Sequence, residues 1–128
     1  MHHTVEDVAI VLGQALRQAL GNKLGIHRYG FLLPMDEAEA KVSIDLSGRG
    51  YCYFEAKFKC EQVGDFPTEM ISHFFETVSD NLGAAIHITV KGENTHHMIE
   101  SIFKCVGKAL GQAVIMNNDQ LPSTKGIL

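Results

Sequence analysis

The chain contains the short motif HHxxE twice, at residues 2–6 and at residues 96–100. Residues three or four apart on a helix share a face, so each motif can bring an imidazole and a carboxylate together. Imidazole and carboxylate ligands without thiolate suit Mn, Fe, Zn or Co rather than Ca or a thiolate-bound structural zinc. The candidate metal ligands in the two motifs are His2, His3, Glu6, His96, His97 and Glu100.

The two histidines of one motif are adjacent and therefore point about 100° apart on a helix. One ion cannot readily take both, so two motifs more naturally hold two separate ions, each shared between helices. An isolated Met1-His2-His3 would be typical of a tag remnant or of a solvated helix start. The second, internal copy favours metal binding.

Two further histidines carry weaker signals when taken alone. His73 lies in the middle of a helical pattern, where a surface or buried structural role is the usual one. His87 alternates within a strand pattern and is expected to be a structural or solvent-facing residue.

Several cations stand beside glycine, serine or threonine. Arg28 precedes Tyr-Gly, Arg49 lies in the SGRG turn, and Lys125 follows Ser123-Thr124. Lys104 lies on the helix that begins with the second HHxxE motif. Guanidinium forks and ammonium groups near hydroxyls and glycine amides suit a phosphate. Each cation alone is typical of a solvated surface charge, so only the set indicates an anion site.

Helical spacing of apolar residues covers three segments. The first helix is expected over residues 2–20, and the second opens at Asp65–Thr68 and reaches Leu82. The third is expected from about His96 to Ile115, after a turn and cap at Gly92–Thr95. The first and third helices look like copies of one element, because HHxxE and a later LGQA occur in both.

Alternation of apolar and polar residues predicts strands over residues 31–47, 51–60 and 84–90. The first two flank the Ser47–Gly50 turn and are expected to form a hairpin with one buried face.

Composition narrows the class of protein. A length of 128 residues suits one domain, and a net charge of −4 gives no nucleic-acid or anionic-membrane signature. No apolar run is long enough for a membrane span, and no signal peptide is expected. Three scattered cysteines, odd in number, are expected to be reduced thiols in a cytoplasmic protein.

Seven strings occur in order along the chain: HHTVED, RYG, LPMDEA, DLSGR, VGDFPTEMISHFF, NTHHMIESIFK and LPSTKGIL. Together they resemble the imidazoleglycerol-phosphate dehydratase family from His2 to Leu128. The resemblance implies a monomer of two similar α+β halves, each a ribosomal protein S5 domain 2-like unit. It also implies a homo-oligomer with active sites between subunits, and two Mn²⁺ ions per site. The substrate would be imidazole glycerol phosphate, dehydrated to imidazole acetol phosphate in histidine biosynthesis.

By position, the resemblance assigns roles to individual residues. The six histidines and glutamates of the two motifs match family metal ligands, and His73 matches a further one, against its usual structural role. Asp36 matches a polar residue of the active site. The residues that match substrate-phosphate ligands are Arg28, Arg49, Lys104, Ser123 and Lys125.

The resemblance also implies a division of the chain. Residues 1–21 match the last helix of the family's first half, and residues 22–128 match the second half and its tail, read as a two-strand hairpin, a helix, a strand and a helix. The family's preceding strands, one further histidine ligand and an acid–base glutamate have no counterpart here. Gly50 also stands where the family commonly has proline.

The sequence leaves three functions open. The first is the dehydratase, either alone or as a portion that needs the family's remaining segment. The second is an inactive fragment, or a metal-binding assembly module, that kept the fold. The third, weaker candidate is a two-metal hydrolase, whose typical Asp-rich ligand set is missing from this sequence.

Overall fold

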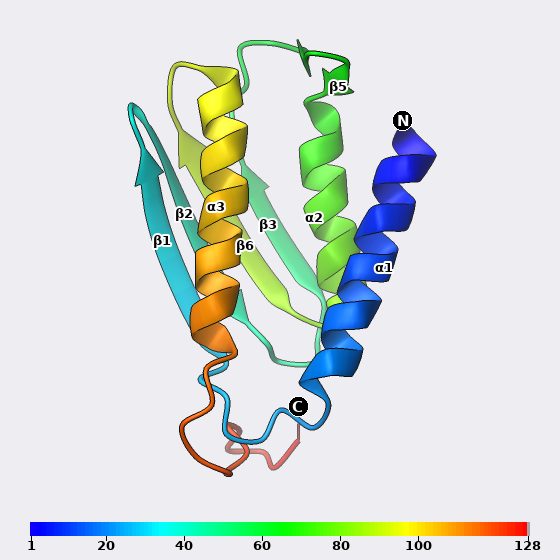
Figure 1. The fold of residues 1–128 in the computed structure, drawn as a ribbon, viewed down its shortest axis with the longest axis vertical. Coiled ribbons are helices and arrows are strands. Elements are labelled where there is room, and N and C mark those ends of the chain that lie inside the picture. Colours follow the sequence, from blue (N-terminus) through cyan, green and yellow to red (C-terminus); the bar gives the residue numbers. More distant parts are fainter. Residues whose placement is uncertain (128) are drawn as a thin grey trace.

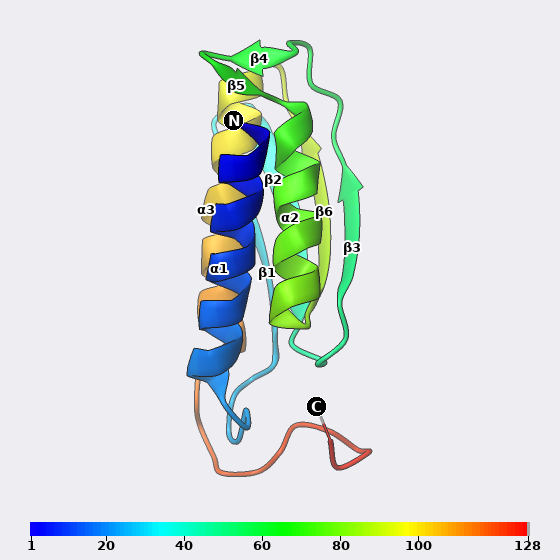
Figure 2. The same ribbon diagram turned by 90° about the vertical axis from the view of Figure 1, so that its right-hand side faces the viewer.

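A four-stranded mixed sheet carries three helices on one of its faces (Figures 1 and 2). The computed structural model describes residues 1–127, apart from the side chains of residues 30–33, and Leu128 lies outside the described residues. The arrangement is α+β and confirms the expected fold class. No helix in the described part of the chain is long and apolar enough to cross a membrane.

The three predicted helices are present as α1 (His2–Leu20), α2 (Glu69–Leu82) and α3 (Thr95–Ala113). At the start of α3 the predicted cap forms, since the side chain of Asn94 accepts a hydrogen bond from the backbone N–H of His97. Residue Gly83 ends α2 in the left-handed region, at φ 73°, a conformation that glycine adopts without strain.

Four strands form the main sheet in the order β1–β2–β6–β3. Their bounds are β1 (Tyr29–Met35), β2 (Ala38–Asp45), β3 (Tyr51–Glu55) and β6 (Ala85–Lys91). A small separate ribbon of β4 (Gln62–Val63) and β5 (Phe66–Pro67) precedes α2.

The predicted hairpin around the Ser47–Gly50 turn is wrong. Residues 31–47 are divided at Asp36-Glu37 into two strands, and the antiparallel hairpin is the β1–β2 pair. Strand β3 pairs in parallel with β6, across α2, and does not follow β2 in the sheet. Alternation of residues assigns the two faces of a strand but does not identify its neighbour, which is why the pattern misled.

One face of the sheet is buried beneath the helices. Along β2, buried Ala40, Val42 and Ile44 alternate with exposed Glu39, Lys41 and Ser43. The helices α2 and α3 cover this face, and α1 packs against α2 (Figure 1). Burial of each large apolar side chain there, such as Phe75 or Ile102, contributes about 1.5–3 kcal/mol.

All three helices begin at the same end of the molecule, which we call the helix-start end (Figure 1). It also holds the turn between β1 and β2. The opposite end, the tail end, holds the β2–β3 connection and residues 114–127, which pack against residues 25–28. Apart from Lys104, the candidate metal ligands and the candidate phosphate-binding residues lie at opposite ends of the molecule.

Candidate functional site

His2, Glu6 and His73 converge at the helix-start end. One ligand atom from each lies within 4.8 Å of the others. Glu6 Oε2 is 3.2 Å from His2 Nε2 and 3.5 Å from His73 Nε2, and the two imidazole rings stack with centroids 4.8 Å apart. Packing of α1 on α2 therefore brings together an i, i+4 pair on one helix and a histidine on the other.

The His73 imidazole fits a metal site for a further reason. Its Nε2 atom is buried and makes no hydrogen bond to any residue that the structure describes. A buried nitrogen without a hydrogen bond is costly, and in proteins such an atom is usually satisfied by water, an ion or a ligand. A divalent cation held by two imidazoles and one carboxylate is one such partner.

The second motif divides its side chains between two directions. His96 Nε2 lies 3.3 Å from Glu100 Oε2, and Lys104 Nζ lies 2.9 Å from Glu100 Oε1. The hydrogen bond from Lys104 is the main cause that lowers the pKa of Glu100. Lys104, expected among the phosphate ligands, thus lies beside a candidate metal ligand.

His97 turns away from His96 toward the β1–β2 turn. Its Nδ1 atom is 2.9 Å from Glu37 Oε2, and Glu37 Oε1 accepts a hydrogen bond of 2.9 Å from the backbone N–H of Asn94. The hydrogen bond with His97 is the main cause that lowers the pKa of Glu37 to about 2, and it likewise raises the pKa of His97.

Sequence reasoning did not single out Glu37 as a partner of His97. Its only signal was its position directly after Asp36 in LPMDEA, and its partner His97 is 60 residues away. Asp36 itself lies exposed in the same turn at φ 49°, and its charge contributes to the raised pKa of His97. His3 is exposed on α1, edge-on to His2, and lies outside the His2–Glu6–His73 cluster.

An apolar cavity of about 380 Å³ opens beside the second motif. It lies between the first turn of α2, the first half of α3 and the β4–β5 ribbon, and its residues are Val63, Phe66, Ile71, His96, Ile99, Glu100 and Phe103. The cavity offers apolar walls with one imidazole and one carboxylate at its edge.

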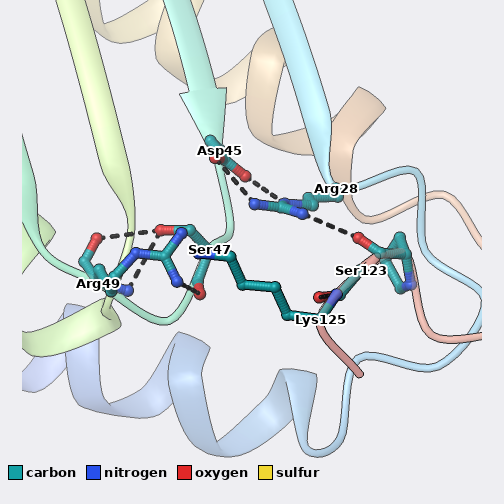
Figure 3. Close-up of polar contacts among 7 residues, drawn as sticks. Arg28, Asp45, Ser47, Arg49, Ser123 and Lys125 are labelled. Atoms are coloured by element: carbon teal, nitrogen blue, oxygen red, sulfur yellow. Dashed lines mark hydrogen bonds and ion pairs between the residues drawn. The ribbon is translucent and has the colours of Figure 1, made fainter. Parts of the chain in front are cut away.

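At the tail end, Arg28 links the sheet to the C-terminal segment (Figure 3). Its guanidinium makes two hydrogen bonds to Asp45 and one of 2.9 Å to the carbonyl of Pro122. Only 12% of its side chain is exposed. The Arg28 guanidinium is therefore already paired within the chain. The sequence did not indicate that Asp45 would be its partner.

Arg49 and Lys125 face one another across the same end. The backbone N–H of Arg49 donates to Ser47 Oγ at 3.2 Å, and its guanidinium donates to the Ser47 carbonyl at 3.3 Å. Ser123 Oγ accepts from the backbone N–H of Lys125 at 3.2 Å. In Figure 3 the Lys125 side chain extends from the tail toward the Ser47–Arg49 turn. Two exposed cations and a hydroxyl group here can receive an anion.

The two candidate sites lie far apart within one chain. Helix α3 has 19 residues and rises about 1.5 Å per residue, so its ends are roughly 28 Å apart. Its first turn carries His96 and His97, whereas the carbonyl of its last residue, Ala113, accepts a hydrogen bond from Arg28 N–H. The structure therefore gathers the metal-type ligands at one end and Arg28, Arg49, Ser123 and Lys125 at the other.

Comparison with known proteins identifies the family. A sequence profile described as imidazoleglycerol-phosphate dehydratase matches residues 1–110. Over 127 residues the chain is 55% identical to the histidine biosynthesis bifunctional protein HisB of Actinobacillus pleuropneumoniae and 57% identical to that of Legionella pneumophila. These matches cover 99% of the chain but 35% and 36% of the relatives. The chain thus spans about a third of their length.

Two solved structures show the same fold. Imidazoleglycerol-phosphate dehydratase of Staphylococcus aureus is 44% identical with a TM-score of 0.87, over 91% of this chain and 69% of that one. The enzyme of Pyrococcus furiosus is 36% identical with a TM-score of 0.85, over 99% of this chain and 71% of that one. The chain belongs to the imidazoleglycerol-phosphate dehydratase family.

Proposed function

We propose that the chain supplies metal-binding and phosphate-binding groups of an imidazoleglycerol-phosphate dehydratase, a hydro-lyase of histidine biosynthesis. The observation that carries this proposal is the His2–Glu6–His73 cluster, in which a buried His73 nitrogen has no hydrogen-bond partner among the described residues. Family membership supports the reaction: loss of water from imidazole glycerol phosphate to give imidazole acetol phosphate.

The cytoplasm is the proposed compartment, since none of the three cysteines forms a disulfide in the described chain.

The proposed cofactor is Mn²⁺, two ions per active site. The residues that would hold it are His2, His3, Glu6, His73, His96, His97 and Glu100. When bound, the metal would act as a Lewis acid toward the substrate. Nitrogen and carboxylate donors without thiolate suit this ion.

The chain's own cations would hold the other end of the substrate. Arg49 and Lys125 are exposed and extend toward one another, with Ser123 beside them, and this arrangement supports a role in binding the phosphate (Figure 3). Arg28 would contribute mainly by fixing the tail on which Ser123 and Lys125 stand. Anchoring the phosphate restricts the reacting end of the substrate and lowers the entropic part of the barrier.

The separation of the two candidate sites supports a homo-oligomer. Roughly 25 Å of helix α3 lies between the His96-His97 pair and the backbone of Arg28. One imidazole ring, three carbons and a phosphate cannot span that length. We therefore propose that metal ligands of one subunit and cations of another subunit line each active site.

A second candidate is a metal-binding assembly module, or an inactive fragment, that kept the fold without the chemistry. This candidate must be tested because the match covers only about 70% of each solved relative. By resemblance that portion carries a further histidine ligand and an acid–base glutamate.

A turnover assay separates the two candidates. Imidazole glycerol phosphate and Mn²⁺ are added to the 128-residue chain and to the same chain extended by the segment that its relatives possess. We expect little turnover by the chain alone and strong turnover by the extended protein. Absence of turnover by both would favour the assembly module. Equal rates would show that the additional histidine and glutamate are dispensable.

A further inference from the structure

We propose that Glu37 is a positioning residue that fixes both the direction and the protonated nitrogen of the His97 imidazole. The proposal deepens the proposed function, because it rests on His97 as a metal ligand. Glu37 was not among the residues that the family resemblance assigned.

The hydrogen-bond geometry determines which His97 nitrogen carries the proton. An ionised carboxylate only accepts hydrogen bonds. Both Glu37 oxygens are engaged, Oε1 by the Asn94 backbone N–H and Oε2 by His97 Nδ1, each at 2.9 Å. In the neutral imidazole Nδ1 must then be the donor, and Nε2 keeps the lone pair that a metal requires.

The same carboxylate also holds the start of α3. Asn94 is the N-cap residue, its backbone N–H donates to Glu37, and its side chain accepts from the His97 N–H at 3.1 Å. His97 is thus fixed at its backbone by Asn94 and at its ring by Glu37. A residue of the β1–β2 turn therefore sets the orientation of a ring on α3.

His96 shows the contrast within the same motif. Its side chain is 65% exposed, and its Nε2 atom faces the carboxylate of Glu100. His97 is 33% exposed and faces its carboxylate through Nδ1. The two rings lie at 78° to one another. Only His97 is therefore held through the nitrogen that leaves Nε2 available.

The test reads the tautomer directly, in metal-free protein. Nitrogen-15 NMR of the imidazole side chains at pH 8.5 to 9, where histidine is largely neutral, distinguishes Nδ1–H from Nε2–H. We expect His97 to be an Nδ1–H tautomer in the wild type and to lose that preference in Glu37→Ala. An Nε2–H tautomer in the wild type, or no change in Glu37→Ala, would overturn the proposal.

Two further variants separate positioning from loss of folding. In Glu37→Gln the amide presents one acceptor and one donor to two N–H groups, so a mixture of His97 tautomers is expected in a folded protein. Glu39→Gln, on the exposed side of β2, is the matched control and should leave the His97 tautomer unchanged. Backbone amide spectra show that each variant retains the fold. A change in Glu39→Gln equal to that in Glu37→Gln would overturn the assignment to Glu37.

Mn²⁺ titration of the same variants distinguishes this inference from the proposed function. Loss of a residue that orients a metal-bound histidine typically weakens metal binding about 10–100-fold, and we expect that loss in Glu37→Ala. Wild-type protein that binds no Mn²⁺, yet has His97 in the Nδ1–H form controlled by Glu37, would refute the metal site and retain the positioning role. Tight Mn²⁺ binding that is equal in wild type and Glu37→Ala would refute positioning and retain the metal site.

Discussion

At the scale of single residues, the Glu37–His97 contact gives the helix-start end a defined dependence on pH. Its hydrogen bond lowers the pKa of Glu37 from 4.5 to about 2 and raises the pKa of His97 above 6.5. The lowered Glu37 pKa stabilises the fold above about pH 4.5, and this contribution is lost as pH falls toward 2. The raised His97 pKa stabilises the fold below about pH 6.5, and this contribution is lost as pH rises through the pKa of His97 in the folded protein.

We therefore expect the stability difference between wild type and Glu37→Ala to be largest between about pH 4.5 and 6.5. It should decrease toward pH 2.5 and toward pH 9. Urea unfolding of chelator-treated protein at these pH values measures it, with Glu39→Gln as the control. A difference that is constant with pH would contradict the ion pair.

Only some contacts of the candidate metal site could be predicted from the sequence. The HHxxE spacing predicted that His2 and Glu6 share a face, and they do. The contact of His73 with Glu6 depends on how α1 packs on α2, and the contact of His97 with Glu37 depends on strand pairing. No local spacing reports either arrangement. For His73, the family resemblance supplied what its own neighbourhood in the sequence did not.

At the scale of elements, the close approach of α1 and α2 positions the metal cluster. A Cβ atom on Gly13 would lie 2.8 Å from Asn81 Cβ and 3.1 Å from the backbone of α2. Gly111 holds the equivalent place in the LGQA sequence of α3, and a Cβ there would meet nothing within 4 Å. Gly13 therefore allows the close approach of α1 to α2, whereas Gly111 has no such packing role among the described residues.

This difference gives a paired prediction. Gly13→Leu should push α1 away from α2, lower the free energy of unfolding by about 1–3 kcal/mol and weaken Mn²⁺ binding by separating His2 and Glu6 from His73. Gly111→Ala should instead raise stability by about 0.5–1 kcal/mol, since alanine favours a helix, and leave Mn²⁺ binding unchanged. Equal effects of the two substitutions, measured by urea unfolding and Mn²⁺ titration, would refute the role of Gly13.

The elements also differ in how well the sequence predicted them. Periodicity located all three helices, because each has a continuous apolar face and, for α3, a capping residue. The strand order was not predictable in this way. The Asp36-Glu37 turn was hidden inside one continuous alternation, and the parallel pairing of β3 with β6 is a long-range choice.

At the scale of the whole molecule, α1 presents an apolar surface that the described chain does not cover. Val8, Val11 and Leu12 are 54%, 64% and 41% exposed. A contiguous apolar surface of this kind favours association. We expect Val8→Ser with Leu12→Ser to reduce self-association of the chain in sedimentation velocity. Tyr51→Ser with Tyr53→Ser, on the open face of the sheet, is the control and should not. If the tyrosine variant reduced self-association and the α1 variant did not, α1 would not be the associating surface.

Mn²⁺ titration followed by electron paramagnetic resonance tests most directly whether His2, Glu6 and His73 hold a divalent metal. Chelator-treated wild type, His73→Ala and His87→Ala are compared, the last because His87 is an exposed histidine on the sheet. Loss of a residue that only supports a metal ligand typically weakens binding about 10–100-fold. We predict a larger loss of Mn²⁺ affinity in His73→Ala, whereas His87→Ala should bind Mn²⁺ as the wild type does. Unchanged Mn²⁺ stoichiometry and affinity in His73→Ala would contradict metal binding by this cluster.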